Sequence, residues 1–195
     1  SIKRYIKNIN YEVILIDNAS IDESILMLAN YLTISNKENL GFSKANNQGI
    51  KIAKGRYILL LNSDTEFTSS FLDKMLKKLD QEASVGIATC ALRNKDKSLQ
   101  VSGGYFPNLA RVFTWMTIQD LPFVDNFLKP FHPKVSFKKE MEVDWVTGAF
   151  FLIKKEVIKE IGMLDEDYFM YTEEVDFCFR AKNANWKVLY IPQWS

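Results

Sequence analysis

The sequence is poor in cysteine and histidine and has almost no excess of charge of either sign. Its two cysteines, Cys90 and Cys178, lie far apart and form no CxxC pair. This argues against a disulfide framework and a cysteine-based zinc site, and it favours a reducing compartment. The 25 Lys and Arg residues balance 24 Asp and Glu residues. Because a nucleic-acid-binding domain normally carries a basic excess, we expect no nucleic-acid partner.

Long apolar runs are also absent. No stretch approaches the roughly 18 uninterrupted apolar residues of a membrane-spanning helix, so the sequence predicts no transmembrane segment. A content of 47% hydrophobic and 25% charged residues is ordinary for a globular protein and argues against disorder. Since a chain of 195 residues can bury a sizeable core, we expect a single domain over residues 1–195.

Apolar runs alternate with amphipathic segments through the first half of the chain. We predict buried strands at residues 11–16, 33–35, 57–61 and 85–90. Helices are predicted between and after them, at residues 20–32, 41–54 and 71–79. This alternation predicts an α/β domain with a mostly parallel sheet.

The pattern changes after Leu92. Residues 94–96 are typical of a hairpin turn, and an aromatic-rich stretch with little periodicity follows over residues 102–133. Its aromatic side chains are open to three interpretations: an acceptor groove, a contact with a membrane surface, or a satellite core. His132 is expected to be a surface loop residue. Order is predicted to return with strand-like runs in 143–153, helices at 154–161 and 173–183, and a strand at 187–191.

Polar clusters follow two of the predicted strands. Asp17 and Asn18 come after the first strand, and Asn62, Ser63 and Asp64 come after the strand at 57–61. In open α/β sheets ligands bind beyond the carboxyl ends of the strands, where a carboxylate can bind a hydroxyl group or a hard cation. The same residues also favour turns and helix caps, so both interpretations stay open here.

Two further segments have the composition of a site. Glu173 and Glu174 begin a predicted helix directly after an aromatic run, where apolar neighbours can raise a carboxylate pKa into the range of a general base. Acidic residues are also favoured in any first helical turn. Residues 39–47 place Gly41, Lys44 and two asparagines at a loop-to-helix junction that suits an anionic ligand. The spacing matches neither a P-loop nor a GxGxxG fingerprint.

Six motifs in order resemble those of a family 2 glycosyltransferase, and more narrowly the rhamnosyltransferase-like branch that builds bacterial surface polysaccharides. They are DNAS (17–20), NLGFSKANNQGI (39–50), GRYILLLNSDT (55–65), SGGYFP (102–107), DWVTGAFFLIKKEV (144–157) and GMLDEDYFMYTEEVDFCFR (162–180).

This resemblance implies a GT-A fold, a Rossmann-like, mostly parallel sheet flanked by helices with a small mixed β extension. A nucleotide-binding half would cover about residues 1–92, and an acceptor and catalytic half about residues 93–195. The implied donor is a nucleotide-diphosphate sugar such as a dTDP- or UDP-sugar, and rhamnose is the sugar that the branch suggests. The implied acceptor is a saccharide or a lipid-linked sugar, which fits a cytoplasmic protein at the inner face of the membrane.

The resemblance also implies roles for single residues. Asp17 would hold the base or ribose, with Asn46 and Asn47 as a second wall of the nucleotide site. Asn62 and Asp64 stand at the DXD motif, and Asp64 would bind Mg²⁺ or Mn²⁺. Because Asn62 replaces the first Asp of that motif, the metal would have one fewer negative charge beside it.

Glu174 stands at the position of the family's catalytic base in an inverting transfer. Residues that would line the sugar and acceptor pocket are Asp144, Trp145, Gly148, Asp165 and Glu173. Trp145 is expected to stack on an apolar sugar face.

The resemblance further implies a strand and helix before Ser1 and a histidine-containing segment after Ser195. We therefore expect a fragment with unpaired strand edges. Two alternative functions stay open: a sugar-nucleotide-binding module without turnover, and, less favoured by the motifs, a nucleotidyltransferase.

Overall fold

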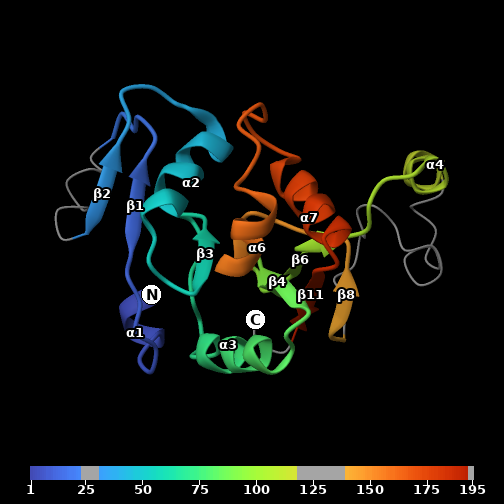
Figure 1. Cartoon of the computed structure of the whole chain (residues 1–195), viewed down its shortest axis with the longest axis horizontal. Coiled ribbons are helices and arrows are strands. Elements are labelled where there is room, and N and C mark those ends of the chain that lie inside the picture. The colour runs from blue at the N-terminus through green and yellow to red at the C-terminus, as the bar shows by residue number, and fades with distance from the viewer. Residues whose placement is uncertain (23–30, 118–138, 193–195) are drawn as a thin grey trace.

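A computed structural model describes residues 1–22, 31–117 and 139–192 as a mixed α/β protein (Figure 1). The helix expected at residues 20–32 lies largely outside the described residues, and His132 and the second half of the aromatic stretch lie outside them too. Leu32, which we expected to end that helix, instead begins a strand.

The central sheet has five strands in the order β3 (Tyr57–Leu61), β10 (Phe150–Lys154), β4 (Val85–Cys90), β11 (Lys187–Ile191) and β8 (Met141–Val143). Among these strands only β4 and β11 pair in parallel. The sheet is therefore mixed rather than mostly parallel, because β10 enters between β3 and β4 in the opposite direction. β3, β4 and β11 still run the same way, so their carboxyl ends point to one edge.

A second sheet consists of β1 (Ile14–Asp17) and β2 (Leu32–Ser35), which pair in parallel. In the described part of the chain β1 pairs only with β2, and β3 pairs only with β10. Both sheets lie against helix α2 (Gly41–Ile52): Gly49 approaches Ile14 and Ile16, while Ile50 belongs to the core around β3.

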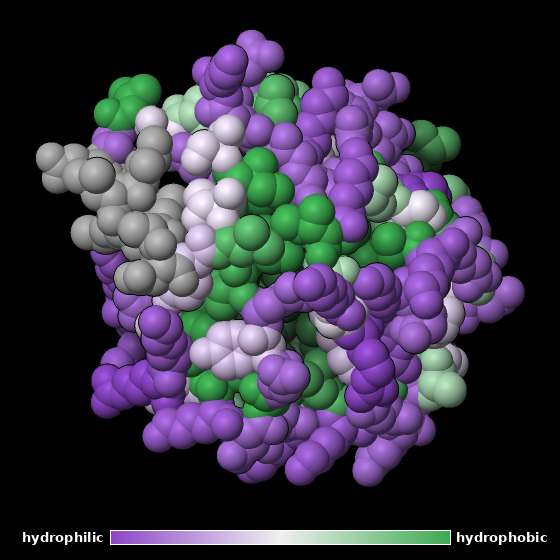
Figure 2. All heavy atoms as spheres, turned by 60° about the vertical axis from the view of Figure 1, so that its left-hand side comes forward, coloured by the Kyte–Doolittle hydropathy of each residue, from purple (hydrophilic) through white to green (hydrophobic). Residues whose placement is uncertain are grey.

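Apolar surface gathers on the side of the molecule shown in Figure 2.

Two apolar clusters cover the two faces of the central sheet. Along β10, Phe151 and Ile153 belong to one cluster, and Phe150 and Leu152 belong to the other, as the period of two of a strand requires. Helices α2, α6 (Lys155–Ile161) and α7 (Glu173–Asn183) supply side chains to the first cluster. Helix α3 (Leu72–Gln81) and the residues after the one-turn helix α1 (Ile2–Tyr5) supply the second.

Short strands and one helix extend from this core. The expected turn at residues 94–96 is confirmed, since it joins β5 (Leu92–Arg93) to β6 (Leu99–Gln100) in an antiparallel pair. Next, β7 (Gly103–Gly104) pairs with β9 (Trp145–Val146), and helix α4 (Leu109–Thr117) projects away from the body of the molecule (Figure 1). None of the helices that the structure describes is long and apolar enough to cross a membrane.

Candidate functional site

Gly148 lies where three predicted motifs meet. It precedes β10, whose first residue pairs with the last residue of β3, and the Asn62 N–H donates to the Ala149 carbonyl oxygen at 3.3 Å. A Cβ atom on Gly148 would lie 2.8 Å from Cζ of Phe42 in α2, so any larger residue here would displace the Phe42 ring or the backbone. The Gly148 backbone N–H also lies close enough to the Glu174 carboxylate to oppose the rise in its pKa. The turn at 62–64, α2 and α7 therefore converge on one glycine.

The start of helix α7 has an unusual backbone. Tyr171 and Thr172 both have φ of 69°, the left-handed region that side chains other than glycine rarely occupy. Two such residues in succession store strain, and strained non-glycine residues cluster at functional sites. Here they turn the chain so that Glu173 and Glu174 begin the helix directed into the protein.

The two glutamates are poorly solvated. Burial raises the pKa of Glu174 to about 7; its own backbone N–H and that of Gly148 oppose the shift, and the negative charge of Glu173 adds to it. Burial also raises the pKa of Glu173, whose side chain is only 4% exposed. Among the described residues, Oε2 of each glutamate has no hydrogen-bond partner. A carboxylate that titrates near neutral pH is suited to general-base chemistry.

The loop before α7 is fixed to the start of α2. The Phe42 N–H donates to the Phe169 carbonyl oxygen at 2.7 Å, and Gly41 has φ of +81°. A Cβ atom on Gly41 would overlap that same oxygen, so this contact requires glycine. Met170 and Tyr171 are exposed beside the glutamates and give the site an apolar rim.

Asp17 and Asn18 lie at the end of β1, as predicted. Asp17 is 5% exposed, and its Oδ1 accepts a hydrogen bond from the Ser20 N–H at 2.9 Å. Asn18 accepts from the Leu40 N–H at 3.0 Å and donates to the Gly41 carbonyl oxygen at 3.3 Å. These bonds join the end of β1 to the start of α2, so both predicted nucleotide-binding segments occupy one corner.

A network of amide side chains, not identified as such from the sequence, holds this corner together. Asn36 exchanges two hydrogen bonds with Gln48 at 3.0 and 2.9 Å, and it also donates to Asn18 at 3.2 Å. Asn18 in turn donates to Asn39 at 2.7 Å. The richness in Asn and Gln was the available signal, but the pairing depends on contacts between segments.

Asn46 and Asn47 use their amide groups internally. Asn46 donates to the Phe42 carbonyl oxygen one turn back in α2, at 2.9 Å. The buried Asn47 donates to Leu164 O at 2.8 Å and to Glu166 at 3.0 Å, and it accepts from the Leu164 N–H at 3.1 Å. Asn47 thus fixes the loop after α6 to α2.

Asn62 and Asp64 lie in an exposed turn after β3. The Thr65 N–H closes this turn by donating to the Asn62 carbonyl oxygen at 3.0 Å. Within the described ranges no three His, Cys, Asp or Glu residues form a ready metal cluster. One exposed carboxylate with an amide oxygen nearby does fit a hard cation that takes most of its ligands from a bound diphosphate and water.

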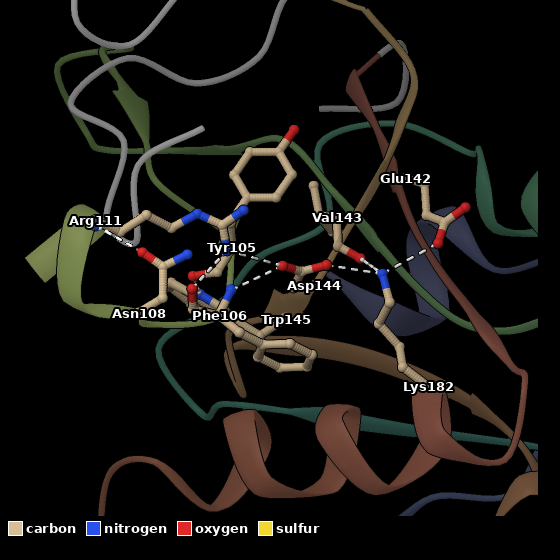
Figure 3. Close-up of polar contacts among 9 residues, drawn as sticks. All are labelled: Tyr105, Phe106, Asn108, Arg111, Glu142, Val143, Asp144, Trp145 and Lys182. Atoms are coloured by element: carbon tan, nitrogen blue, oxygen red, sulfur yellow. Dashed lines mark hydrogen bonds and ion pairs between the residues drawn. The ribbon is translucent and has the colours of Figure 1, made fainter. Parts of the chain in front are cut away.

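The other predicted pocket residues lie in different surroundings. The Trp145 side chain is 4% exposed, and its indole N–H donates to the Tyr105 carbonyl oxygen at 3.3 Å, so it packs in the core rather than facing solvent. Asp165 is exposed, and its carboxylate accepts from the Asp167 N–H in a turn. Asp144 is bonded to three protein donors (Figure 3).

The fold is that of GT-A glycosyltransferases. Mannosyltransferase PcManGT from Pyrobaculum calidifontis, solved in complex with GDP-Man and Mn²⁺, has a similar fold with a TM-score of 0.61. The match covers 93% of this chain and 46% of that one, at 13% sequence identity. At this identity the similarity establishes the fold alone.

The chain belongs to glycosyl transferase family 2, whose family model matches residues 1–162. Rhamnosyltransferase WbbL of Escherichia coli K12 is 28% identical over 160 residues, which cover 78% of this chain and 58% of WbbL. The N-acetylglucosaminyl-diphospho-decaprenol L-rhamnosyltransferase of Mycobacterium tuberculosis is 24% identical over 195 residues, which cover 92% of this chain and 64% of that protein. The chain thus spans less than two thirds of the length of these relatives.

Proposed function

We propose that this chain carries out an inverting transfer of a sugar from a nucleotide-diphosphate sugar to an acceptor hydroxyl, with Glu174 as the general base. The observation that carries the proposal is the environment of the Glu174 carboxylate. It is desolvated, has a pKa of about 7 and lies beside Gly148, where the turn at 62–64 and helix α2 also meet.

In this reaction the Glu174 carboxylate takes the proton of the acceptor hydroxyl while that oxygen attacks the anomeric carbon. The bond to the diphosphate oxygen breaks as the new glycosidic bond forms, so one displacement inverts the anomeric configuration. A base with a pKa near the working pH is both sufficiently deprotonated and sufficiently basic. Strain at Tyr171 and Thr172 supports this role because it directs the carboxylate into the protein.

Asp64 would hold a divalent cation, Mg²⁺ or Mn²⁺, together with an oxygen of Asn62. The exposure of this turn leaves room for the phosphate oxygens and waters that complete the coordination of such ions. When bound, the cation would stabilise the negative charge on the departing nucleotide diphosphate. Asp17 and the amide network at the start of α2 support a nucleotide site in the adjacent corner.

The names of the two relatives support a narrower proposal, that the donor sugar is rhamnose. The mycobacterial relative's name specifies a diphospho-decaprenol acceptor, which supports a lipid-linked acceptor for this chain too. Such an acceptor would place the protein at the cytoplasmic face of a membrane. We propose surface polysaccharide synthesis as the setting.

A donor screen tests the proposal. Nucleotide binding is measured by calorimetry with UDP and dTDP in the presence of Mn²⁺, and transfer is measured with UDP- and dTDP-sugars on saccharide and polyprenyl-linked acceptors. Transfer with inverted configuration is the expected result. Binding without turnover for any donor and acceptor would instead identify a sugar-nucleotide-binding module.

A further inference from the structure

The carboxylate of Asp144 joins two parts of the protein that the chain does not connect directly (Figure 3). Its Oδ2 accepts from the Phe106 N–H at 2.9 Å and lies 3.5 Å from Nη1 of Arg111 at the start of α4. Its Oδ1 accepts from Nζ of Lys182, near the end of α7, at 2.8 Å. We call Arg111, Asp144 and Lys182 the clasp.

The clasp is largely sheltered from solvent. The side chains of Arg111, Asp144 and Lys182 are 22%, 18% and 24% exposed. Partly buried ion pairs are screened less by salt than surface pairs, and removing one partner leaves an uncompensated charge. Because both Asp144 oxygens already accept from protein donors, the geometry favours an internal role over direct contact with a sugar.

The clasp fixes residues 103–111 against α7. The Phe106 ring packs edge-on against the ring of Phe179 in α7, with centroids 5.3 Å apart. Phe179 lies shortly before Lys182 in the same helix. The segment is attached on its other side too, since the Asp144 N–H donates to the Gly104 carbonyl oxygen at 2.8 Å. Helix α7, strand β9 and residues 103–111 are therefore held as one unit.

Two parts of this unit, the segment after β9 and helix α7, contact or carry Glu174, the proposed base. Strand β9 continues through Thr147, whose N–H donates to Ser102 O at 3.0 Å, to Gly148, whose N–H lies close enough to the Glu174 carboxylate to oppose the rise in its pKa. Lys182 lies eight residues after Glu174 in the same helix, about 12 Å along its axis. The clasp thus fixes the far end of the helix that carries Glu174 and the segment that borders it. Within the described residues, no hydrogen bond links the amide network around Asn18 and Asn36 to the clasp.

We infer that Asp144 is a positioning residue for the acceptor side of the site, holding residues 103–111 against α7 through Arg111 and Lys182. The inference rests on the proposed function, since it assigns the clasp to the acceptor rather than the nucleotide. A displacement of about 1 Å can cost on the order of 100-fold in rate, so a loosened clasp weakens acceptor use strongly.

Four variants test it: Asp144→Ala, Asp144→Asn, Lys182→Met and the control Glu142→Gln. Glu142 also contacts Lys182, at 3.1 Å, but in the part of the chain that the structure describes it forms no ion pair or side-chain hydrogen bond with residues 103–111. We expect Asp144→Ala and Lys182→Met to raise the acceptor KM or lower kcat by about 10- to 100-fold. Nucleotide affinity should stay within about twofold. Asp144→Asn should be intermediate, because its amide oxygen still accepts from Phe106 N–H.

Amide hydrogen exchange of residues 102–111 supplies the second readout. We expect faster exchange in Asp144→Ala and Lys182→Met but not in Glu142→Gln. Unchanged acceptor kinetics in Asp144→Ala, or an equal loss of nucleotide affinity, would overturn the inference. If the unaltered chain transfers no sugar, the proposed function fails, and the exchange data still decide whether the clasp holds the segment. Should Asp144→Ala not fold, Asp144→Asn and Lys182→Met are compared with the Glu142→Gln control instead.

Discussion

The backbone N–H of Gly148 lies close enough to the carboxylate of Glu174 to oppose the rise in its pKa, and the Phe42 ring occupies the space where a Gly148 side chain would be. This pairing joins the turn before β10 to the first turn of α7. It also sets the environment of the carboxylate, because an N–H donor stabilises the charged form while burial destabilises it. The predictions below follow from these two residues and from the exposed turn after β3.

Replacement of Glu174 by Gln should abolish proton abstraction with little change in shape. We expect kcat to fall by roughly 10²- to 10⁴-fold. Nucleotide affinity, measured by calorimetry, should remain within about twofold. Glu173→Gln is the matched control, and it should lose much less activity. An equal loss in both variants would mean that the pair, rather than Glu174, carries the function.

The rate of transfer should depend on the protonation of Glu174. Burial raises its pKa to about 7, so the base is protonated and inactive in acid. We expect kcat/KM to fall about tenfold per pH unit well below pH 7 and to level off above it. The measurement is a pH profile with saturating metal. If the fall in rate on the acid side has a pKa near 4.5, the ordinary pKa of a glutamate, then Glu174 is not the group that titrates.

The same shift predicts a cost in stability. Because the folded-state pKa of Glu174 lies above its unfolded value, its contribution to folding is present below about pH 4.5 and is lost as pH rises through about 7. Glu174→Gln should therefore have a higher Tm than the unaltered chain at pH 8, and the difference should shrink towards pH 4. Thermal melting at both pH values checks this. A lower Tm for the variant at pH 8 would contradict a buried, unpaired carboxylate.

Gly148→Ala should disrupt the junction directly. The new Cβ would lie 2.8 Å from Phe42 Cζ, and overpacking of this kind destabilises by about 1–3 kcal/mol. We also expect loss of transfer, since a shift of the Gly148 backbone changes the surroundings of the Glu174 carboxylate. Gly49→Ala is the control, because its Cβ would meet Ile16 Cδ1 at an ordinary 3.4 Å. Chemical denaturation and transfer assays distinguish the two, and equal behaviour would show that the Phe42 contact is easily relieved.

Asp64→Asn should act through the metal. The substitution removes the carboxylate of the exposed turn, so half-maximal activity should require about tenfold or more Mn²⁺, with the fold of the protein unchanged. Glu66→Gln removes an exposed carboxylate two residues away and serves as the control. A metal titration of transfer checks both variants. An unchanged Mn²⁺ requirement in Asp64→Asn would place the metal elsewhere.

The spacing of apolar residues predicted the helices and strands whose formation depends mainly on their own sequence. The helix at residues 173–183 and the strand at 187–191 occur as predicted, since each combines the right apolar period with clear boundaries. The direction of β10 did not follow from its sequence. An apolar run has the same composition in either direction, and here a long excursion after β4 decides which way the chain returns.

The site shows the same division. The position of Glu174 at the start of a helix was predicted, but the approach of its carboxylate to Gly148 depends on how α7 packs against β9. The nucleotide-site role of Asn47 stays a prediction, while its hydrogen bond with Leu164, 117 residues away, had no local signal in the sequence. Asp144 was likewise predicted from its motif, while its contacts with Arg111 and Lys182 join distant segments and had no local signal.

Strands β1 and β3 belong to different sheets, and this arrangement has a consequence for refolding the purified protein. Two strands that each leave an edge unpaired within the described residues can recruit strands from other molecules, and an apolar setting strengthens this tendency. Refolding from denaturant therefore competes with intermolecular pairing, whose rate rises with concentration while folding does not. The recovered monomer should fall as the protein is refolded at higher concentration, and dilute refolding is the practical route to material for every measurement above.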